Sequence, residues 1–317
     1  MTQLEQFIRD VDVGLSKTKK ELSSKYFYDA RGSELFVQIM NLPEYYLTRS
    51  EADIFKNKSM ELIKLFNIDK NEYVELIELG SGDGTKTKEL LKVMDQKGFN
   101  FDYLPIDISE SSLYSLKEML NRELPHVLVQ VQHGDYFDIL SSLRKRKHKK
   151  ILFFLGSNLG NYNDEKASQF LYQLGANLHP NDLLVLGLDM IKDKEMVLAA
   201  YNDKAGVTRQ FNLNLLNRIN NQLGGNFNLS SFQHAPEYCS DKGVATSYLQ
   251  STTRQSVTIE KTGKSYQFDE GEKIHVEISR KYSDAVLANI IEKTDFSLVG
   301  KIMDSDGYFA DYVLQRG

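Results

Sequence analysis

Three short groups of residues in the first half of the chain have the composition of a nucleotide site. The first is Glu78-Leu79-Gly80-Ser81-Gly82-Asp83-Gly84, which directly follows a short apolar run. Its glycines allow a sharp turn and let a ligand approach peptide N–H groups. A helix starting just afterwards would offer its positive end to that ligand. The G-x-G-x-G spacing brings the third glycine one residue earlier than in a nicotinamide-dinucleotide site, which argues against an oxidoreductase.

Acidic residues follow the next two apolar runs. Asp107 comes after the run 101–106, and a carboxylate there can accept hydrogen bonds from both ribose hydroxyls. Asp135 and Tyr136 come after the run 127–131, where an acid could bind the adenine amino group and the aromatic ring could stack on the base. Either aspartate could instead cap a helix. Their recurrence at successive strand ends favours the nucleotide site.

A phosphate-binding loop of the Walker type is a near match. Gly80, Lys86 and Thr87 have its spacing, but Thr85 stands where the second glycine must be. We therefore do not predict a nucleoside triphosphate site.

The elements that position these groups alternate regularly. Strands are predicted at 74–79, 101–106, 127–131, 151–155 and 183–188, with helices at 85–94, 109–120, 136–143 and 167–178 between them. This alternation predicts an α/β fold, with a parallel sheet wound by right-handed crossovers into a Rossmann-like core over residues 50–190. Before it, we expect a helix capped by Ser33 and one helix running from Thr48 to Leu65.

After Asp189 the alternation stops. Helices are expected at 193–201 and 211–223, strands at 246–259, 265–268 and 273–281, a helix at 283–294, and a closing antiparallel pair at 296–303 and 308–314. We therefore predict two domains. The core comprises 50–190 plus 281–317, and a smaller α+β domain comprises 1–49 plus 191–280 and caps the carboxyl ends of the core strands.

The composition excludes several classes of function. The net charge of the 317 residues is -5, so a nucleic-acid partner is not expected, and we expect the basic run 144–150 to be a solvated turn. No apolar run approaches the roughly 18 residues of a membrane span, and the amino terminus lacks a signal-peptide core. With one cysteine, Cys239, we predict a cytoplasmic protein.

The composition also bears on metals and partners. The six histidines lack metal-ligand spacing, so no metal site is predicted. We expect a small-molecule substrate as the partner. The sequence sets no oligomeric state, and a monomer is compatible with it.

The order E-L-G-S-G-D-G, then P-I-D, then G-D-Y resembles class I methyltransferases that use S-adenosylmethionine (SAM). A narrower likeness covers nearly the whole chain and both predicted domains. The strings KYFYDARGSELFVQIMNLPEYYLTRSEADI, FFLGSNLGNYN, VLGLDMIKD, AYNDKAGVTRQFN and GEKIHVEISRKY resemble the histidine-specific N-α-methyltransferases of ergothioneine biosynthesis. The resemblance implies that SAM is the cofactor and that three methyl groups pass to the α-nitrogen of free L-histidine, forming hercynine. It also implies that the core binds SAM and the smaller domain binds the substrate.

The resemblance also implies the roles of particular residues. The implied SAM site comprises Gly80, Lys86, Asp107, Asp135 and Tyr136. The implied substrate site comprises Tyr45, Asn161, Tyr201, Glu277 and Ser279, with Tyr28 close to the amine; Asn161, Tyr28 and Tyr201 would orient the reacting amine. Alternation along a strand puts Glu277 and Ser279 on one face, where both could line a pocket.

One position departs from the family pattern. Where the family has a methionine against the imidazole, this chain has Ser247. A smaller and more polar residue is expected to widen the pocket. It keeps open an N-methyltransferase for another amino acid, such as tryptophan, or for a histidine derivative.

Overall fold

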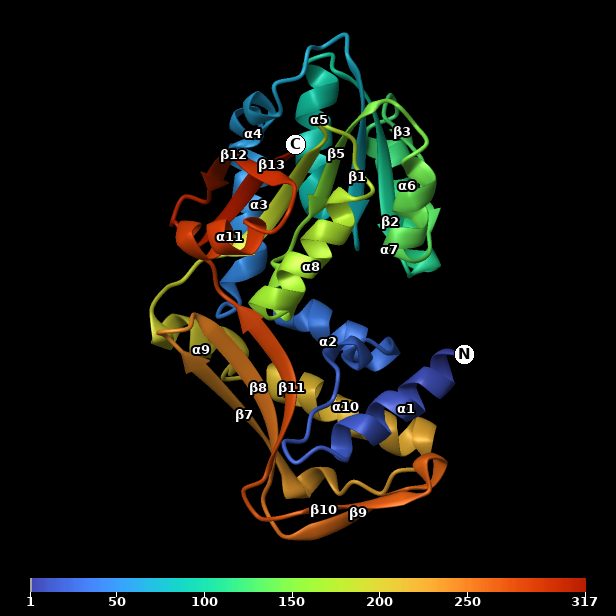
Figure 1. Ribbon diagram of the computed structural model, residues 1–317, viewed down its shortest axis with the longest axis vertical. Helices are drawn as coiled ribbons and strands as arrows, with labels where there is room; N and C mark the ends of the chain where they lie inside the picture. The colour runs from blue at the N-terminus through green and yellow to red at the C-terminus, as the bar shows by residue number, and fades with distance from the viewer. Residues whose placement is uncertain (1) are drawn as a thin grey trace. The chain divides into compact units, whose positions relative to one another are not determined.

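The computed structural model describes residues 2–317, and the chain divides into two compact units (Figure 1). The core unit comprises Leu47–Ile191 and Arg280–Gly317. The second unit comprises 2–46 and Lys192–Ser279. The chain therefore leaves the core unit once, after Ile191, and returns to it at Arg280.

The core unit is built on one mixed sheet. Its strands are β1 (Tyr73–Leu79), β2 (Asn100–Asp107), β3 (Leu128–Val129), β4 (Gln132–His133), β5 (Lys149–Phe154), β6 (Leu183–Asp189), β12 (Phe296–Met303) and β13 (Phe309–Arg316). The order is β12-β13-β6-β5-β1-β2-β3, with β4 also on β2. Strands β1 to β6 pair in parallel, whereas β13 is antiparallel to both β6 and β12. The strand order reverses at β1, which is where open α/β sheets bind ligands.

Helices cover both faces of this sheet. Alternate residues of β1 explain why: Val74 and Leu76 pack in one apolar core, while Ile77 and Leu79 pack in the other. The first core also receives side chains from α3 (Tyr46–Asn57), α4 (Ser59–Phe66), α5 (Thr85–Gln96) and α6 (Glu110–Glu123). The second receives them from α7 (Tyr136–Leu143), α8 (Asp164–Gly175) and α11 (Asp284–Ile291).

The second unit has its own core around the long helix α10 (Val207–Leu223). Its other helices are α1 (Gln3–Leu15), α2 (Ala30–Met40) and α9 (Lys194–Tyr201). A three-stranded sheet has the order β11-β8-β7, and β9 and β10 form a separate antiparallel hairpin. These strands are β7 (Phe232–Cys239), β8 (Val244–Ser251), β9 (Gln255–Ile259), β10 (Lys264–Phe268) and β11 (Lys273–Arg280). Within residues 2–317, no helix combines the length and apolar character that crossing a membrane requires.

Several expected elements differ from the observed ones near the amino terminus. Helix α2 begins at Ala30, before the expected cap Ser33, because the Asp29 carboxylate accepts the N–H of Gly32 at 2.7 Å and caps it. The single helix expected from Thr48 to Leu65 is two helices, α3 and α4, separated at Lys58. There the Lys58 ammonium donates to the carbonyl of Met303 at 2.7 Å.

The strands of the second unit also differ from expectation. The strand expected at 246–259 is two strands, β8 and β9, broken at 252–254. Strand β7 was not predicted, because its polar residues and Pro236 weaken the apolar signal. Its place at an edge of the sheet explains how a strand can contain a proline. In the core unit, the strand expected at 127–131 is reduced to the short pieces β3 and β4, both paired with β2.

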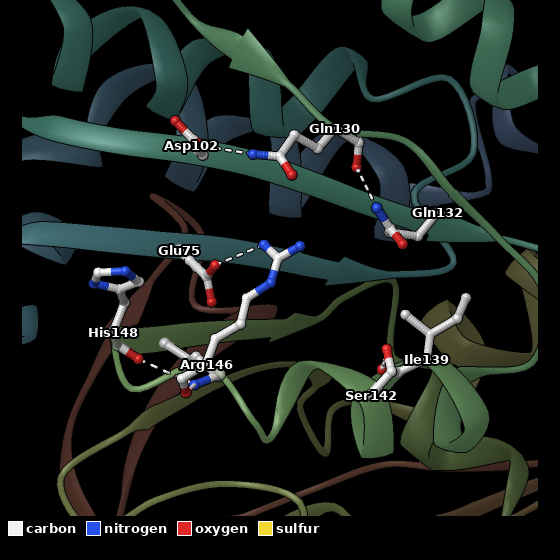
Figure 2. Close-up of polar contacts among 9 residues, drawn as sticks. Glu75, Asp102, Gln130, Gln132, Ile139, Ser142, Arg146 and His148 are labelled. Carbon is white, nitrogen blue, oxygen red and sulfur yellow. Dashed lines mark hydrogen bonds and ion pairs between the residues drawn. The ribbon is translucent and has the colours of Figure 1, made fainter.

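The basic run 144–150 is largely the exposed turn that was predicted, but two of its charges make specific contacts. Lys150 is fully buried, and its ammonium donates to the carbonyls of Arg146 at 2.7 Å and His148 at 3.0 Å. Figure 2 shows Arg146 reaching Glu75, whose carboxylate accepts at 2.8 Å and is 1% exposed. Two charges of the run therefore stabilise the turn before β5.

Two segments of the core unit are bonded to each other where the chain passes to the second unit after Ile191 and returns at Arg280. The Lys281 ammonium lies 2.7 Å from the Asp189 carboxylate, and both side chains are fully buried. Beside this pair, the N–H of Tyr282 donates to the carbonyl of Asp189, and the N–H of Ile191 donates to the carbonyl of Tyr282, both at 2.8 Å. The ion pair and the backbone bonds fix the end of β6 to the returning chain.

Replacing Lys281 by methionine should destabilise the core unit strongly. The change removes the Lys281 ammonium from the buried Asp189 carboxylate, and breaking a buried ion pair in this way typically costs about 3–5 kcal/mol. We expect a loss of that order in the free energy of unfolding measured in urea. A D189N/K281M double variant should recover part of it.

The matched control is R254M. Arg254 pairs with Asp269 at the surface, where the side chains are 86% and 81% exposed, so the loss should stay below about 0.5 kcal/mol. Equal losses in K281M and R254M would contradict a structural role for the buried pair.

Candidate active site

The backbone of the glycine loop after β1 has a conformation that lets a ligand approach it closely. Gly80, Gly82 and Gly84 all have positive φ, at 69°, 54° and 63°. A Cβ on Gly80 would lie 2.7 Å from the Tyr136 hydroxyl oxygen, and one on Gly84 would lie 2.2 Å from the Leu116 side chain. The backbone conformation therefore favours glycine at all three positions, and the neighbours also require it at Gly80 and Gly84.

Asp107 lies at the end of β2 and links this loop to the next helix. One carboxylate oxygen accepts the N–H of Gly82 at 3.2 Å, and the other accepts the N–H of Ser109 at 2.9 Å. Each oxygen can accept a further hydrogen bond, so both remain able to bind hydroxyl groups. This geometry is compatible with the ribose contact expected of Asp107.

Tyr136 begins α7 next to the same loop. Burial, followed by the negative charge of Asp107, raises the pKa of its hydroxyl to about 12. The structure therefore brings Gly80, Asp107 and Tyr136 together. Asp135 is the cap of α7 and accepts the N–H of Phe137 at 2.9 Å, which is the alternative role considered above for this residue.

Ile108 was not among the predicted site residues, although its position next to Asp107 makes it a candidate. This large apolar side chain directly follows Asp107 and is 76% exposed. An exposed apolar surface beside the carboxylate expected to bind ribose suits the face of an adenine ring. In the sequence, the position of this isoleucine between the acidic end of a strand and a helix cap could have indicated it.

Lys86 has a different set of neighbours. Its ammonium pairs with Glu51 on α3, and Glu78 and Asp311 also lie close enough to influence its charge. Burial opposes the charge of Lys86, but the carboxylates outweigh it, so its pKa is raised and it stays protonated. A cation at the first turn of α5 could bind a ligand carboxylate.

Glu78 is the buried acid of the glycine segment. It is 3% exposed and accepts a hydrogen bond from the Tyr103 hydroxyl. Burial raises its pKa to about 7, with the Tyr103 bond acting in the opposite direction. Glu78 therefore titrates near neutrality directly before the loop.

Asn161 ends the short helix η2 (Asn158–Asn161) that follows β5. Its side chain is exposed, and the turn before it contains Gly156 and Ser157, both with positive φ. A Cβ on Gly160 would lie 2.9 Å from the carbonyl of Arg280, so the backbone here is fixed. The structure thus supports an exposed amide on a rigid segment.

The second unit gathers most of the predicted substrate residues. The Ser247 hydroxyl donates to the Glu277 carboxylate at 3.1 Å, and the Tyr201 hydroxyl donates to Ser279 at 2.7 Å. Tyr201, Ser247 and Ser279 are buried, and Glu277 is half-buried. We call these four residues and Tyr28 the acceptor cluster.

Tyr28 is the most exposed member of the acceptor cluster, at 48%. Desolvation, followed by the charge of Glu277, raises the pKa of its hydroxyl. Tyr45 reaches the cluster through Phe36: its ring lies 6.5 Å from that of Phe36, which lies 5.4 Å from the ring of Tyr28. Tyr45 is therefore placed at the margin of the cluster.

Comparison with known proteins decides the family. The model of a family described as histidine-specific, SAM-dependent methyltransferases matches residues 7–316. The chain belongs to this family. It is a SAM-dependent methyltransferase, and its core unit has the Rossmann-like class I fold. This result excludes the alternative of a nicotinamide-dependent oxidoreductase.

Similar proteins carry related names. A histidine N-alpha-methyltransferase of Mycobacterium tuberculosis is 38% identical over 86% of this chain and 84% of its own length. One of Mycolicibacterium smegmatis is 36% identical over 90% of this chain and 87% of its own length. A more distant relative, a 4-dimethylallyltryptophan N-methyltransferase of Claviceps fusiformis, is 28% identical over 59% of this chain and 55% of its own length.

The side chains that could ligate a metal are scattered. Within residues 2–317, no three His, Cys, Asp or Glu side chains are grouped so that they could hold a metal ion. The transfer of a methyl group from a sulfonium to an amine needs no such ion.

The titration of Glu78 predicts a specific pH dependence. Between about pH 4.5 and 7 the folded chain holds a proton that the unfolded chain has lost, so the contribution of Glu78 to stability falls as the pH rises. Glu78→Gln removes this effect. Relative to wild type, E78Q should become more stable across this range, by about 1.4 kcal/mol for each unit of the pKa shift.

The measurement is urea unfolding of both proteins at several pH values. E118Q, a change at an exposed position on α6, is the matched control and should follow wild type at every pH. If the difference between E78Q and wild type did not vary with pH, Glu78 would not titrate as described.

Proposed function

We propose that this protein methylates the α-amino nitrogen of free L-histidine and adds three methyl groups in successive transfers, forming hercynine. The observation that carries the proposal is the acceptor cluster, in which the half-buried carboxylate of Glu277 on β11 is bonded to Ser247 and lies near the Tyr28 hydroxyl. Membership of a histidine-specific family supports the same substrate.

The acceptor cluster suits an imidazole ring. The Glu277 carboxylate can accept from one ring N–H, and the Ser279 hydroxyl can serve the other ring nitrogen. Because Ser247 donates to one oxygen of Glu277, the carboxylate is held in one orientation. A fixed carboxylate favours a ligand that donates from a defined direction, as an azole N–H does.

Methyl transfer itself needs alignment more than acid–base chemistry. The neutral amine forms a bond to the methyl carbon as the bond from that carbon to sulfur breaks, and the positive charge moves from sulfur to nitrogen. The enzyme supplies mainly position for this step. Asn161 can accept from the amine N–H, and Tyr28 and Tyr201 can hold the amine or the carboxylate of the substrate.

SAM supplies the electrophilic methyl group. On the side of the cofactor, Asp107 would hold the ribose, Tyr136, Ile108 and Asp135 the adenine, and Lys86 a carboxylate of the ligand. The positive φ values of the glycine loop and the open oxygens of Asp107 fit such a ligand. These roles are part of the proposal.

The main alternative is methylation of another amino acid, such as tryptophan, or of a histidine derivative. Ser247 favours it, since a serine leaves more room than the methionine of the family pattern. The distant relative named for dimethylallyltryptophan acts on an indole-bearing amino acid by its name. The bond from Ser247 to Glu277 weighs against it, because this bond retains a polar, oriented acceptor for a ring N–H.

The decisive experiment incubates the purified protein with SAM and each free amino acid in turn, with product masses read by mass spectrometry. We expect histidine alone to gain three methyl groups. Product from tryptophan but not from histidine would reject the proposed substrate. Product from histidine that stops at one or two methyl groups would reject trimethylation.

The acceptor cluster predicts graded effects of substitution. Glu277→Gln should lower kcat/KM for histidine about tenfold to a hundredfold, because a hydrogen bond to a charged group is worth roughly 1.5–3 kcal/mol. Ser247→Ala removes only the hydroxyl that orients Glu277 and should raise KM by less, about fivefold, with kcat nearly unchanged.

Steady-state kinetics with histidine as the varied substrate would measure both effects. E270Q changes an exposed glutamate before β11 and should behave as wild type. If E277Q had the kinetic constants of E270Q, Glu277 would not contact the substrate.

A further inference from the structure

Close to the cofactor residues lies a buried carboxylate that the proposed chemistry does not use. Glu51 on α3 is 1% exposed. One of its oxygens accepts the N–H of Gly156 at 2.8 Å, and the other pairs with the ammonium of Lys86. Lys86 lies in the first turn of α5, and Gly156 begins the turn that leads to Asn161. One side chain therefore joins the segment of a cofactor residue to the segment of an amine-orienting residue.

The fold leaves space for this carboxylate. A Cβ on Gly187 of β6 would lie 2.0 Å from the Glu51 oxygen that accepts from Gly156. The carbonyl of Gly187 also accepts the N–H of Ser157 at 3.0 Å. The turn at 156–157 is thus fastened to α3 on one side and to β6 on the other.

A second buried acid lies against the same group. Asp311 on β13 is fully buried, and neither of its carboxyl oxygens has a hydrogen-bond partner among residues 2–317. Burial, and then the charge of Glu51, raises the pKa of Asp311 well above its usual range, with Lys86 acting in the opposite direction. Of these two buried acids, Glu51 is the one that pairs directly with the Lys86 ammonium.

We propose that Glu51 is a positioning residue for methyl transfer, which holds the Lys86 ammonium and the 156–161 segment in the arrangement that binds SAM. This inference rests on the proposed function, because it takes from it the roles of Lys86 and Asn161. Glu51 itself acts through other residues. Since it is the carboxylate bonded to Lys86, it fixes the direction of that ammonium.

A double-mutant cycle tests whether Glu51 acts through Lys86. S-Adenosylhomocysteine is titrated by calorimetry into wild type, E51Q, K86M and E51Q/K86M. We expect E51Q to weaken binding about tenfold, as the loss of a charge-assisted contact does. In the K86M background the same change should weaken binding by less than about twofold, because the partner is already absent. Additive effects of the two substitutions would overturn the inference.

The matched control is D311N. Because neither carboxyl oxygen of Asp311 has a hydrogen-bond partner among residues 2–317, this variant should bind S-adenosylhomocysteine within about twofold of wild type and keep its kcat. Equal losses in E51Q and D311N would mean that the two acids form one structural cluster, which also overturns the inference. Should E51Q fail to fold, E51D keeps the charge but withdraws it by one methylene, and the same cycle can be run with it.

Steady-state kinetics adds a comparison of kcat with KM, which a simple loss of folding stability would not change. E51Q should raise KM for SAM and also lower kcat, whereas K86M should act mainly on KM. Binding of S-adenosylhomocysteine needs no methyl acceptor, so the cycle remains readable if histidine is not the substrate. Failure of the proposed substrate would appear as intact binding without histidine product.

Discussion

The core unit depends on the buried ion pair between Lys281 and Asp189. Both charges are fully buried, and each offsets part of the desolvation cost of the other. The pair lies where β6 ends and where the chain returns from the second unit. The pair holds the returning chain next to the end of β6. Strand β13 then pairs antiparallel with β6, and the parallel strands keep their order. A long insertion is thereby compatible with one continuous sheet.

The same sheet determines where the predicted cofactor residues lie. Parallel strands β1, β2 and β5 end at one edge, so the glycine loop, Asp107 and the turn at Gly156 come together there although they are distant in sequence. The acceptor cluster arises differently. Its Ser247, Glu277 and Ser279 lie on neighbouring strands β8 and β11 of the second unit, where hydrogen bonds between side chains fix their orientation.

The parts of the fold that could be predicted are those with a strong local signal. The apolar runs of β1, β5 and β6 and the glycine segment indicated the α/β core, and the family motifs indicated the residues that gather in the acceptor cluster. Strand β7 was missed because its apolar signal is weak around Pro236. At the break at Lys58 the side chain bonds to the carbonyl of Met303, a contact that no local pattern contains. The cluster of Glu51, Lys86 and Asp311 joins three distant segments, and only the folded sheet brings them together.

The charges of the acceptor cluster also bear on repeated methylation. In each proposed transfer one positive charge moves from sulfur to nitrogen, so the total charge of the reacting pair does not change. Loss of a proton restores a neutral amine after the first and second transfers, and after the third no proton remains to be lost. In the proposed mechanism, Glu277 and the tyrosine rings of Tyr28 and Tyr201 would serve every transfer without rearrangement, since aromatic faces attract a quaternary ammonium as they attract its protonated precursors. The amine must rotate between transfers to present its lone pair again. In the proposed mechanism the exposed amide of Asn161 can accept from an amine N–H before the first and second transfers only, because the neutral dimethylated amine has no N–H.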